Sequence, residues 1–356
     1  MTCFRYLFIR DATIRKKENK MSNIENNQNS FNEVLSLIQE SKRQVYKQAN
    51  SMLITLYWDL GAYISNKTTK ENWGKGVVKA LAEYIKQKDP SLKGFTDKNL
   101  WRMRQFYQTY SHDEKLATLW RQLNWSNNRT IFSRCKREEE REFYLNFAVK
   151  EGWGNRELER QIDTSLFERV LLADNNLSDV VKSLPQSTEK TFRDSYVFEF
   201  LDIPTKHSEK TLQQALVSSL KDFILELGKG FTFMGQEYRL QVDVEDFFID
   251  LLFYHRDLQC LIAFELKIGK FKPAYLGQLE FYLEALDRDV KKEHENPSIG
   301  VLLCRDKTDK VVEYALSRSQ SPTVIADYNT ELIPKELLTQ KVEELYRLYD
   351  GESDSE

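Results

Sequence analysis

Two neighbouring apolar runs in the second half of the chain carry charges where a buried β-strand should have none. The runs are FFIDLLFYH, residues 247–255, and CLIAFELKI, residues 260–268. The first contains Asp250, and the second contains Glu265 and Lys267. An ionised carboxylate in an apolar interior costs several kcal/mol or more unless something pairs with it. The runs therefore predict a buried sheet together with a reason for keeping charge inside it.

The segments around these runs define an order of elements. The helical pattern EKTLQQALVSSLKDFILELGKG comes first, and the strand-like run FTFMGQEYRLQV lies between it and the charged runs. After them, AYLGQLEFYLEALDRDVKK has a helical pattern, and SIGVLLC and TVIADY are short and apolar. The sequence therefore predicts an αβββαβ domain at residues 208–345, in which helices pack against a mixed sheet.

The first half of the chain has a different periodicity. Between residues 31 and 170, apolar side chains recur at three- and four-residue steps, which predicts an all-helical domain and makes the chain α+β overall. The remaining segments are predicted to be a flexible extension at 1–30, a polar linker at 171–207 and an acidic tail at 346–356. Because the residues after Met21 are polar, we hypothesise that translation begins at Met21 and not at Met1.

The composition argues against several kinds of protein. No apolar run approaches the roughly 20 residues that a membrane helix needs, so we expect no membrane partner. The four cysteines form no CxxC pair and there are only four histidines, which argues against structural zinc and fits a reduced, cytoplasmic setting. The formal net charge of −3 argues against a uniformly basic surface, although it leaves room for basic patches.

Side-chain alternation separates the charged residues of the second run from its apolar ones. Glu265 and Lys267 point to one face of the strand. Phe264, Leu266 and Ile268 point to the other face, towards a helix-covered core.

Asp250 joins the charged face if the hairpin register sets it beside Glu265. Neighbouring carboxylates raise the cost of ionising each other, and a hard divalent cation such as Mg²⁺ removes that conflict. The backbone carbonyl of Leu266 is a natural third ligand, because Mg²⁺ also binds carbonyl oxygens. Lys267 is placed to orient an attacking water and to stabilise negative charge on a phosphate. Two acids, a lysine and a metal together predict a phosphodiester hydrolase site.

The alternative is an ordinary edge strand. A Glu and a Lys two residues apart are common on solvated strand faces, and so short a motif often matches by chance. Two observations favour the site. Both runs are too apolar for an edge strand, and Asp250 is the only charged residue between Phe247 and Tyr254.

Asp250 followed, after a gap, by Glu265-Leu266-Lys267 resembles the signature of the PD-(D/E)XK nuclease superfamily. The core of that superfamily, the restriction-endonuclease-like fold, has this αβββαβ order. The segments DFFIDLLFYH, ELKIGKFKPAYLGQLEFYLEALD and NPSIGVLLC resemble the YhcG-type nucleases of bacteria. Further upstream, five segments resemble the N-terminal domain of the same family: LYWDLGAYI, WGKGVVKALAEYI, GFTDKNLWRMRQFY, QLNWS and REFYLNFAVKEGW. The resemblance covers about residues 31–345.

The resemblance implies an Mg²⁺-dependent endonuclease acting on DNA, with Mn²⁺ as an alternative metal and RNA as an alternative substrate. It implies Asp250 and Glu265 as metal ligands and Lys267 as the catalytic lysine. It also singles out Gln278 and Tyr282, because GQLEFY matches the Q-x-x-x-Y pattern of some superfamily nucleases. These two side chains share a helix face. Either that face meets DNA or the site, or Tyr282 belongs to the core and Gln278 contacts a loop.

One position departs from the superfamily pattern. Many members supply a further glutamate from the first core helix, where this chain has Gln213 followed by another neutral residue, Gln214. Glu209, one turn earlier, is either a substitute or a solvated acid at the start of the helix. A glutamine coordinates through its carbonyl oxygen but adds no charge, so the departure bears on activity and not on the fold.

A stretch of the helical domain is basic. Between Lys93 and Arg137 there are ten Lys and Arg residues against three Asp and Glu residues. In KNLWRMRQFY the apolar positions are expected in the core, so Lys98, Arg102 and Arg104 point outward, as in a helix that reads DNA. The alternatives are an ordinary charged face and a surface that docks another subunit in a homo-oligomer. In the second domain, Lys270 and Lys272 are the best-placed phosphate contacts.

Three functional hypotheses follow. The first is a metal-dependent DNA endonuclease with a DNA-binding domain in front of it. The second is a nucleic-acid-binding protein that keeps the nuclease fold but cleaves weakly or not at all. The third is a helical DNA-binding regulator whose C-terminal half only oligomerises.

Overall fold

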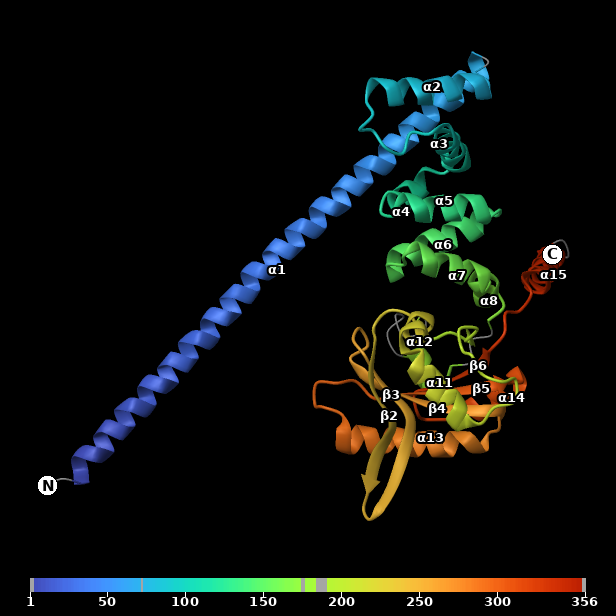
Figure 1. Ribbon diagram of the computed structural model, residues 1–356. Coiled ribbons are helices and arrows are strands. Elements are labelled where there is room, and N and C mark those ends of the chain that lie inside the picture. Colours follow the sequence, from blue (N-terminus) through green and yellow to red (C-terminus); the bar gives the residue numbers. More distant parts are fainter. Residues whose placement is uncertain (1–2, 72, 174–176, 184–190, 354–356) are drawn as a thin grey trace. The chain divides into compact units, whose positions relative to one another are not determined.

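The computed structural model describes residues 3–71, 73–173, 177–183 and 191–353 (Figure 1). The chain divides into two compact units, Met1–Val149 and Lys150–Glu356. The first unit is helical, and the second contains a six-stranded mixed sheet with helices. The chain is therefore α+β, as the sequence predicts.

The first unit consists of helices. They are α1 (Cys3–Lys70), α2 (Lys75–Lys88), α3 (Asp97–Tyr110), a 3₁₀ helix (Glu114–Leu116), α4 (Ala117–Trp120), α5 (Trp125–Arg134) and α6 (Glu138–Glu151). α1 crosses α3 at Gly61, where a Cβ atom would lie 2.1 Å from the backbone oxygen of Met103. Only glycine lets the two helix backbones approach so closely.

Aromatic rings fill the core of this unit. Trp58 of α1 stacks on Trp120 of α4 with 5.0 Å between the ring centroids. Phe106 of α3 contacts both rings edge-on, and Trp125 of α5 contacts Phe106 in the same way. The aromatic-rich segments of the sequence therefore build a core that joins α1, α3, α4 and α5.

The second unit contains a sheet with the strand order β1-β6-β5-β4-β3-β2. The strands are β1 (Ser195–Val197), β2 (Phe231–Val242), β3 (Glu245–His255), β4 (Cys260–Lys270), β5 (Ile299–Asp306) and β6 (Thr323–Asn329). β2, β3 and β4 pair antiparallel, and β4, β5, β6 and β1 pair parallel. The strands from β2 to β6 coincide with the runs that the sequence predicts.

Helices cover both faces of this sheet (Figure 1). α11 (Glu209–Ser218) and α12 (Leu220–Leu227) pack on the face that includes Leu266, and α13 (Ala274–Ala285) packs on the face that includes Ala263. The other helices of this unit are α7 (Asn155–Asp163), α8 (Leu166–Leu171), α9 (Asp179–Ser183), a π-helical turn (Leu286–Val290), α14 (Asp309–Leu316) and α15 (Lys335–Ser353).

The segment predicted as a linker, 171–207, is in part a sheet element. It contains β1, which pairs in parallel with β6. A three-residue strand is too short to show a periodicity, and its partner strand lies far away in the sequence. The linker prediction was therefore wrong for residues 195–197.

Other predicted divisions also differ from the arrangement of elements. α1 runs through most of the predicted extension, and α15 runs through part of the predicted tail. The boundary between the units follows Val149, before the predicted end of the helical domain at residue 170. It lies there because Arg160 of α7 and Arg169 of α8 both bind Glu226 of α12.

Each unit contains buried thiols. Cys135 lies in the first unit, Cys260 and Cys304 lie in the sheet, and none of the three forms a disulfide. Burial raises the pKa of the Cys260 and Cys304 thiols to about 12, so both stay protonated near neutral pH. In the described ranges, no helix combines the length and the apolar character that crossing a membrane requires.

Candidate active site

β3 and β4 separate at the point where the predicted acids lie. The backbone ladder between them ends with the pair Leu251 and Phe264. Beyond this pair, the Asp250 side chain takes the place of a β3 carbonyl as hydrogen-bond acceptor. Its Oδ2 accepts a hydrogen bond from the Leu266 amide of β4 at 2.8 Å. Asp250 and Glu265 therefore occupy matching positions of the two strands, which is the register that the predicted site needs.

A change of side-chain direction in β3 explains how Asp250 reaches β4. Ile249 packs with the apolar residues under α13, whereas Leu251 packs with those under α11 and α12. Residues two apart in a regular strand point to the same face, so β3 twists between these two. The facing strand β2 is also irregular here, with a φ of 45° at Glu237. The twist directs the Asp250 carboxylate along the sheet, towards β4.

Glu265 and Lys267 form a buried ion pair. The Glu265 side chain is 4% exposed and the Lys267 side chain 12% exposed, and Lys267 Nζ donates to Glu265 Oε1 at 2.8 Å. Lys267 Nζ also lies 3.7 Å from Glu209 Oε2 of α11 and 5.4 Å from the ring centroid of Tyr275 of α13. The ammonium group is thus held by two carboxylates and an aromatic ring.

The local environment disfavours ionisation of both acids together. Burial raises the pKa of Glu265 to about 7, and the charge of Asp250 adds to this, while Lys267 opposes both. Burial also raises the pKa of Asp250, against the hydrogen bond from the Leu266 amide. Burial lowers the pKa of Lys267, but its hydrogen bond to Glu265 and the nearby acids outweigh burial and raise it. One charged lysine therefore faces an excess of carboxylates.

The oxygen atoms at this point fit a hard divalent cation. Glu265 Oε2 is buried and has no hydrogen-bond partner, so it is available to a further ligand. The amide and the carbonyl of one strand residue point to the same side, so the Leu266 carbonyl faces β3 and Asp250. Mg²⁺ binds carboxylate and carbonyl oxygens and takes its remaining ligands from water and phosphate.

The number of acids in the site is small. In the part of the chain that the structure describes, no group of three or more His, Cys, Asp or Glu residues has the geometry of a metal site. The protein would thus supply two carboxylates, Asp250 and Glu265. That number suits Mg²⁺, which is commonly held by one or two carboxylates together with substrate phosphates.

Gln213 of α11 contacts the backbone of Asp250. Its side chain is buried, and its Nε2 donates a hydrogen bond to the Asp250 carbonyl oxygen at 2.8 Å. The amide thereby holds β3 in place just where the ladder to β4 has ended. A glutamate here would bring a carboxylate oxygen against that carbonyl oxygen, because an ionised carboxylate only accepts hydrogen bonds. The neutral residue therefore has a positioning role.

Gln278 and Tyr282 of α13 bind each other. Gln278 Nε2 donates to the Tyr282 hydroxyl at 2.7 Å. Tyr282 is buried in the apolar cluster under α13, whereas Gln278 is exposed. Burial raises the pKa of Tyr282, the hydrogen bond from Gln278 lowers it, and the charges of Glu265 and Asp250 raise it further. Tyr282 thus combines a core position with a hydroxyl that binds Gln278 and is subject to the charges of both acids.

β4 leaves the core after Lys267. Ile268, predicted to face the helix-covered core, is 39% exposed, so that prediction was wrong. The strand continues beyond the helices that pack on it. Lys270 lies 3.6 Å from Asp306 of β5, with both side chains largely in solvent, and Lys272 is exposed. Both lysines are therefore accessible to a ligand.

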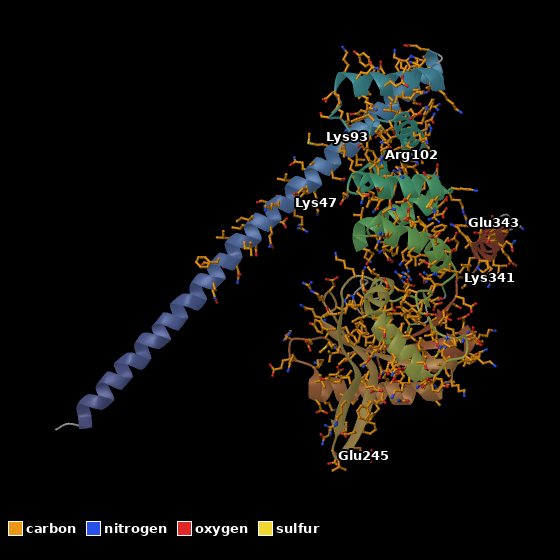
Figure 2. The ribbon with its side chains drawn as sticks, in the orientation of Figure 1. Lys47, Lys93, Arg102, Glu245, Lys341 and Glu343 are labelled. Carbon is orange, nitrogen blue, oxygen red and sulfur yellow. The ribbon has the colours of Figure 1, made fainter. Side chains whose placement is uncertain are left out.

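The basic residues predicted in the first unit lie on α3. Lys98 and Arg102 are exposed, and Arg102 is marked in Figure 2. Arg104 is partly buried, with its guanidinium group 5.2 Å from the ring centroid of Trp101. The Arg104 Nε is buried and has no hydrogen-bond partner.

Sequence reasoning missed two residues near the acids. Tyr275 places its ring beside Lys267. The sequence could have indicated this residue, because it lies in the first turn of α13, the helix that follows β4. Glu237 raises the pKa of Asp250 through its charge, and an exposed acid on β2 gives no sequence signal. Glu209, for which two interpretations were open, forms an ion pair with Lys267.

Known proteins match both halves of the chain. A family model described as the YhcG PDDEXK nuclease domain matches residues 189–344, and one described as the DUF1016 N-terminal domain matches residues 33–169. The chain is 30% identical over 346 residues to YhcG of Escherichia coli (strain K12), whose curated name assigns it nuclease activity only provisionally. That match covers 87% of this chain and 92% of the relative.

Solved structures match less of the chain. A repair endonuclease from Pyrococcus abyssi is 14% identical with a TM-score of 0.24, over 36% of this chain and 49% of its own. An EndoMS–dsDNA2 complex is 16% identical with a TM-score of 0.25, over 36% of this chain and 46% of its own. This chain spans about half the length of each solved chain, and scores this low support no argument. The two family models and the E. coli relative show that the chain belongs to the YhcG nuclease family, with a DUF1016 N-terminal domain before a PDDEXK nuclease domain.

Proposed function

We propose that the protein is an Mg²⁺-dependent endonuclease that hydrolyses DNA, with Mn²⁺ as an alternative metal. The family match supplies the nuclease domain, and PDDEXK nucleases generally use divalent metals. The observation that carries the proposal is the pair Asp250 and Glu265 at the end of the β3–β4 ladder, with Glu265 Oε2 buried and unpaired. Such a pair is costly without a cation and useful with one.

Each residue of the pair and its neighbours has a role in this proposal. Asp250, Glu265 and the Leu266 carbonyl would hold the cation. When bound, Mg²⁺ would polarise the scissile phosphate and lower the pKa of a water molecule. Lys267, held by Glu265 and Glu209, orients the attacking water and stabilises charge on the phosphate. The fixed ammonium group needs little rearrangement when charge develops.

The surrounding residues position this group and contact the substrate. Gln213 keeps the Asp250 backbone in place. Tyr282 and Gln278 form one polar pair on α13 that would contact the sugar–phosphate chain. Lys270 and Lys272, at the exposed end of β4, would bind phosphates further along the strand.

Cleavage of a circular DNA by the full-length chain tests the nuclease proposal. Wild type with Mg²⁺ is expected to cut the circle, and EDTA is expected to stop cutting. Lys267→Ala and Glu265→Gln are expected to lower the rate at least 100-fold. The first removes the ammonium group that acts on the reacting phosphate, and the second removes a carboxylate that would hold the cation. Lys270→Ala, a matched loss of an exposed lysine, should lower it only a few-fold. Equal rates for wild type and Lys267→Ala would reject the proposal.

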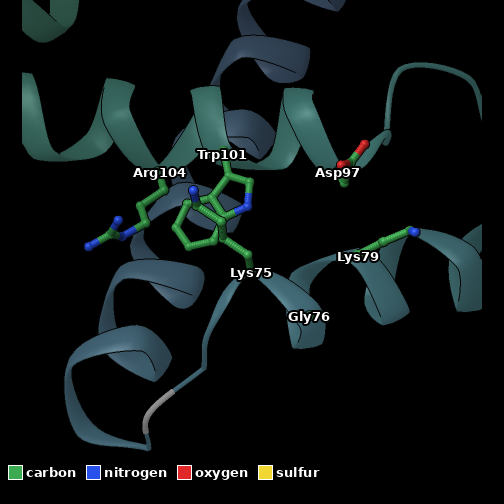
Figure 3. A pocket seen from close by; sticks show the side chains of 6 residues that line it. All are labelled: Lys75, Gly76, Lys79, Asp97, Trp101 and Arg104. Atoms are coloured by element: carbon green, nitrogen blue, oxygen red, sulfur yellow. The ribbon is translucent and has the colours of Figure 1, made fainter.

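We further propose that the first unit binds DNA through a basic pocket between α2 and α3 (Figure 3). The pocket has a volume of about 580 Å³ and is lined by Lys75, Gly76, Lys79, Asp97, Trp101 and Arg104. Figure 3 shows Trp101 extending from α3 to Lys75 at the start of α2, with Arg104 extending from α3 to one side of the Trp101 ring.

The charges and the ring in this pocket suit a nucleotide. Lys75, Lys79 and Arg104 make no ion pair within the described ranges, and Asp97 is the single acid among the lining residues. Trp101 contacts no aromatic ring in those ranges, unlike Trp58, which stacks on another tryptophan. Unpaired cations beside an aromatic face bind the phosphates and bases of nucleic acids.

Charge reversal tests this binding surface. Arg102→Glu with Arg104→Glu, and separately Lys75→Glu with Lys79→Glu, are expected to weaken DNA binding and to reduce its dependence on salt. Lys47→Glu serves as the control, because Lys47 lies on α1 (Figure 2) and is not one of the residues that line the pocket. Unchanged affinity in both double variants would remove the first unit from the DNA contact surface.

A binding protein with weak cleavage is the second candidate function. It is favoured by the two-carboxylate site and by the neutral Gln213. It predicts that wild type and Lys267→Ala bind DNA equally and that neither cuts. The same assays with single-stranded RNA decide between DNA and RNA as the substrate. We place the protein in the cytoplasm, a proposal supported by the buried thiols of Cys260 and Cys304, which suit a reducing compartment.

A further inference from the structure

A row of exposed apolar side chains follows one side of α1. We call it the α1 seam; its large apolar members are Phe31, Leu35, Ile38, Val45, Met52, Leu56 and Tyr63. Their exposed fractions lie between 43% and 69%. Lys42, Ala49 and Asp59 complete a series in which the steps alternate between four and three residues. That alternation is a heptad repeat, with a mean period of 3.5 residues.

The opposite side of α1 is the one that packs within its own unit. Ile54, Tyr57, Gly61 and Ile64 are buried, and Gly61 is the point of closest approach to α3. The α1 seam therefore faces away from the core of the unit. Before Asn50, all described side chains from Phe31 onward are exposed, so no residue of the described ranges packs against this part of the helix.

An unsupported helix with this surface is unstable in water. Isolated helices owe little stability to their own hydrogen bonds, and helices in proteins depend on packing of an apolar face. A row of seven large apolar side chains in solvent also exceeds the scattered exposure of a monomeric protein. The α1 seam therefore needs a covering partner.

We infer that the α1 seam pairs with the α1 seam of a second copy of this chain to form a coiled coil. The 3.5-residue period matches a helix as the partner, because two helices that supercoil keep that period in contact. The stretch from Phe31 to Tyr63 is about 50 Å long. Pairing two such seams buries on the order of 1,000 Å², which reaches the size of a specific interface.

The partner is a second α1 because no other helix in the described part of the chain matches its length. The next longest described helix, α15, spans 19 residues, and its Leu338 and Val342 are already buried. Lys42 and Asp59 stand at core positions of the repeat. A single lysine at such a position lowers the stability of a coiled coil but fixes its register, which is typical of a specific pair.

The mass of the full-length chain in solution tests this inference. At micromolar concentration, light scattering after size exclusion is expected to give twice the chain mass of 42.1 kDa. The double variant Leu35→Glu, Val45→Glu is expected to give 42.1 kDa, with at least a 100-fold weaker association, because it places four carboxylates in one seam pair.

Leu37→Glu is the matched control. Leu37 is 68% exposed, against 52% for Leu35, and it lies on the same turn but away from the α1 seam. This variant is expected to remain a dimer. Far-UV circular dichroism adds a second readout. The double variant should have a weaker helical signal than wild type, and wild type should lose the same signal on dilution. Tryptophan fluorescence from the aromatic core should stay unchanged in both cases. A wild-type mass of one chain, or a double variant as dimeric as wild type, would overturn the inference.

Discussion

Glu265 has one oxygen bound to Lys267 and one buried oxygen with no donor. Asp250, at the matching position on β3, is held by the Leu266 amide. Both acids are thus fixed by the backbone arrangement before any ligand binds. Such a site lowers the stability of the folded protein but binds a cation without rearrangement. The repulsion between the two carboxylates disfavours the empty site and favours binding of a cation.

The first prediction concerns Glu265. Without a divalent metal and near neutral pH, Glu265→Gln is expected to raise the melting temperature by a few degrees, because burial and the charge of Asp250 disfavour the ionised Glu265 carboxylate in the folded protein. Added Mg²⁺ should raise the melting temperature of wild type and leave that of the variant nearly unchanged. Differential scanning calorimetry in EDTA and in Mg²⁺ measures both. A variant less stable than wild type in EDTA would contradict the argument.

The second prediction concerns Gln213. Gln213→Glu is expected to lower the free energy of unfolding by about 1–3 kcal/mol, because a carboxylate would replace the donor to the Asp250 carbonyl. Cleavage should fall as well, although the variant adds the acid that many superfamily members carry. Gln214→Glu, at the neighbouring exposed position, is the control. Faster cleavage by Gln213→Glu would show that the position serves as a metal ligand.

At the scale of elements, Gly61 sets the distance between α1 and α3. Gly61→Ala is expected to destabilise the first unit by about 2 kcal/mol, because the new Cβ would meet the Met103 backbone oxygen, which has little freedom to move. Gly76→Ala on α2 is the matched control, since its Cβ would meet nothing within 4 Å. That variant should be neutral or slightly stabilising. Chemical denaturation followed by tryptophan fluorescence measures both.

The elements that the sequence predicts best are those with a strong local pattern. β3 and β4 follow from alternation, and the placement of Asp250 opposite Glu265 follows from one hairpin register. Three features depend on contacts between distant segments and left no local pattern. These are the pairing of β1 with β6, the hydrogen bond from Gln213 to Asp250 and the exposure of Ile268 beyond the packed helices. The sequence shows residue types, whereas these features depend on where an element ends against its neighbours.

At the scale of the whole molecule, one buried carboxylate links four parts of the second unit. Glu226 of α12 lies within 3.3 Å of Arg160 and Arg169, and 3.0 Å from Arg193. It also accepts a hydrogen bond from the Val197 amide of β1 at 3.0 Å. Burial raises the pKa of Glu226, but the three guanidinium groups and this amide outweigh burial and lower the pKa to about 2.

The fourth prediction is the pH dependence that Glu226 causes. Its folded-state pKa of about 2 lies below the ordinary value of 4.5, so its contribution to stability is fully present above pH 4.5. That contribution, about 3 kcal/mol, is lost as the pH falls from 4.5 towards 2. Glu226→Gln should be destabilised near neutral pH and should show a flatter pH profile. Urea unfolding between pH 3 and pH 7 measures this, and parallel profiles for the two proteins would contradict it.

The buried thiols allow the stability of each unit to be followed separately. A thiol reagent reaches Cys135 only when the first unit opens, and it reaches Cys260 and Cys304 only when the sheet opens. With Cys3 replaced by Ser, the labelling rate at each remaining cysteine, resolved by peptide mass spectrometry, reports the opening equilibrium of its own unit. In the intact chain, the natural cysteines thus report the opening of each half of the protein separately.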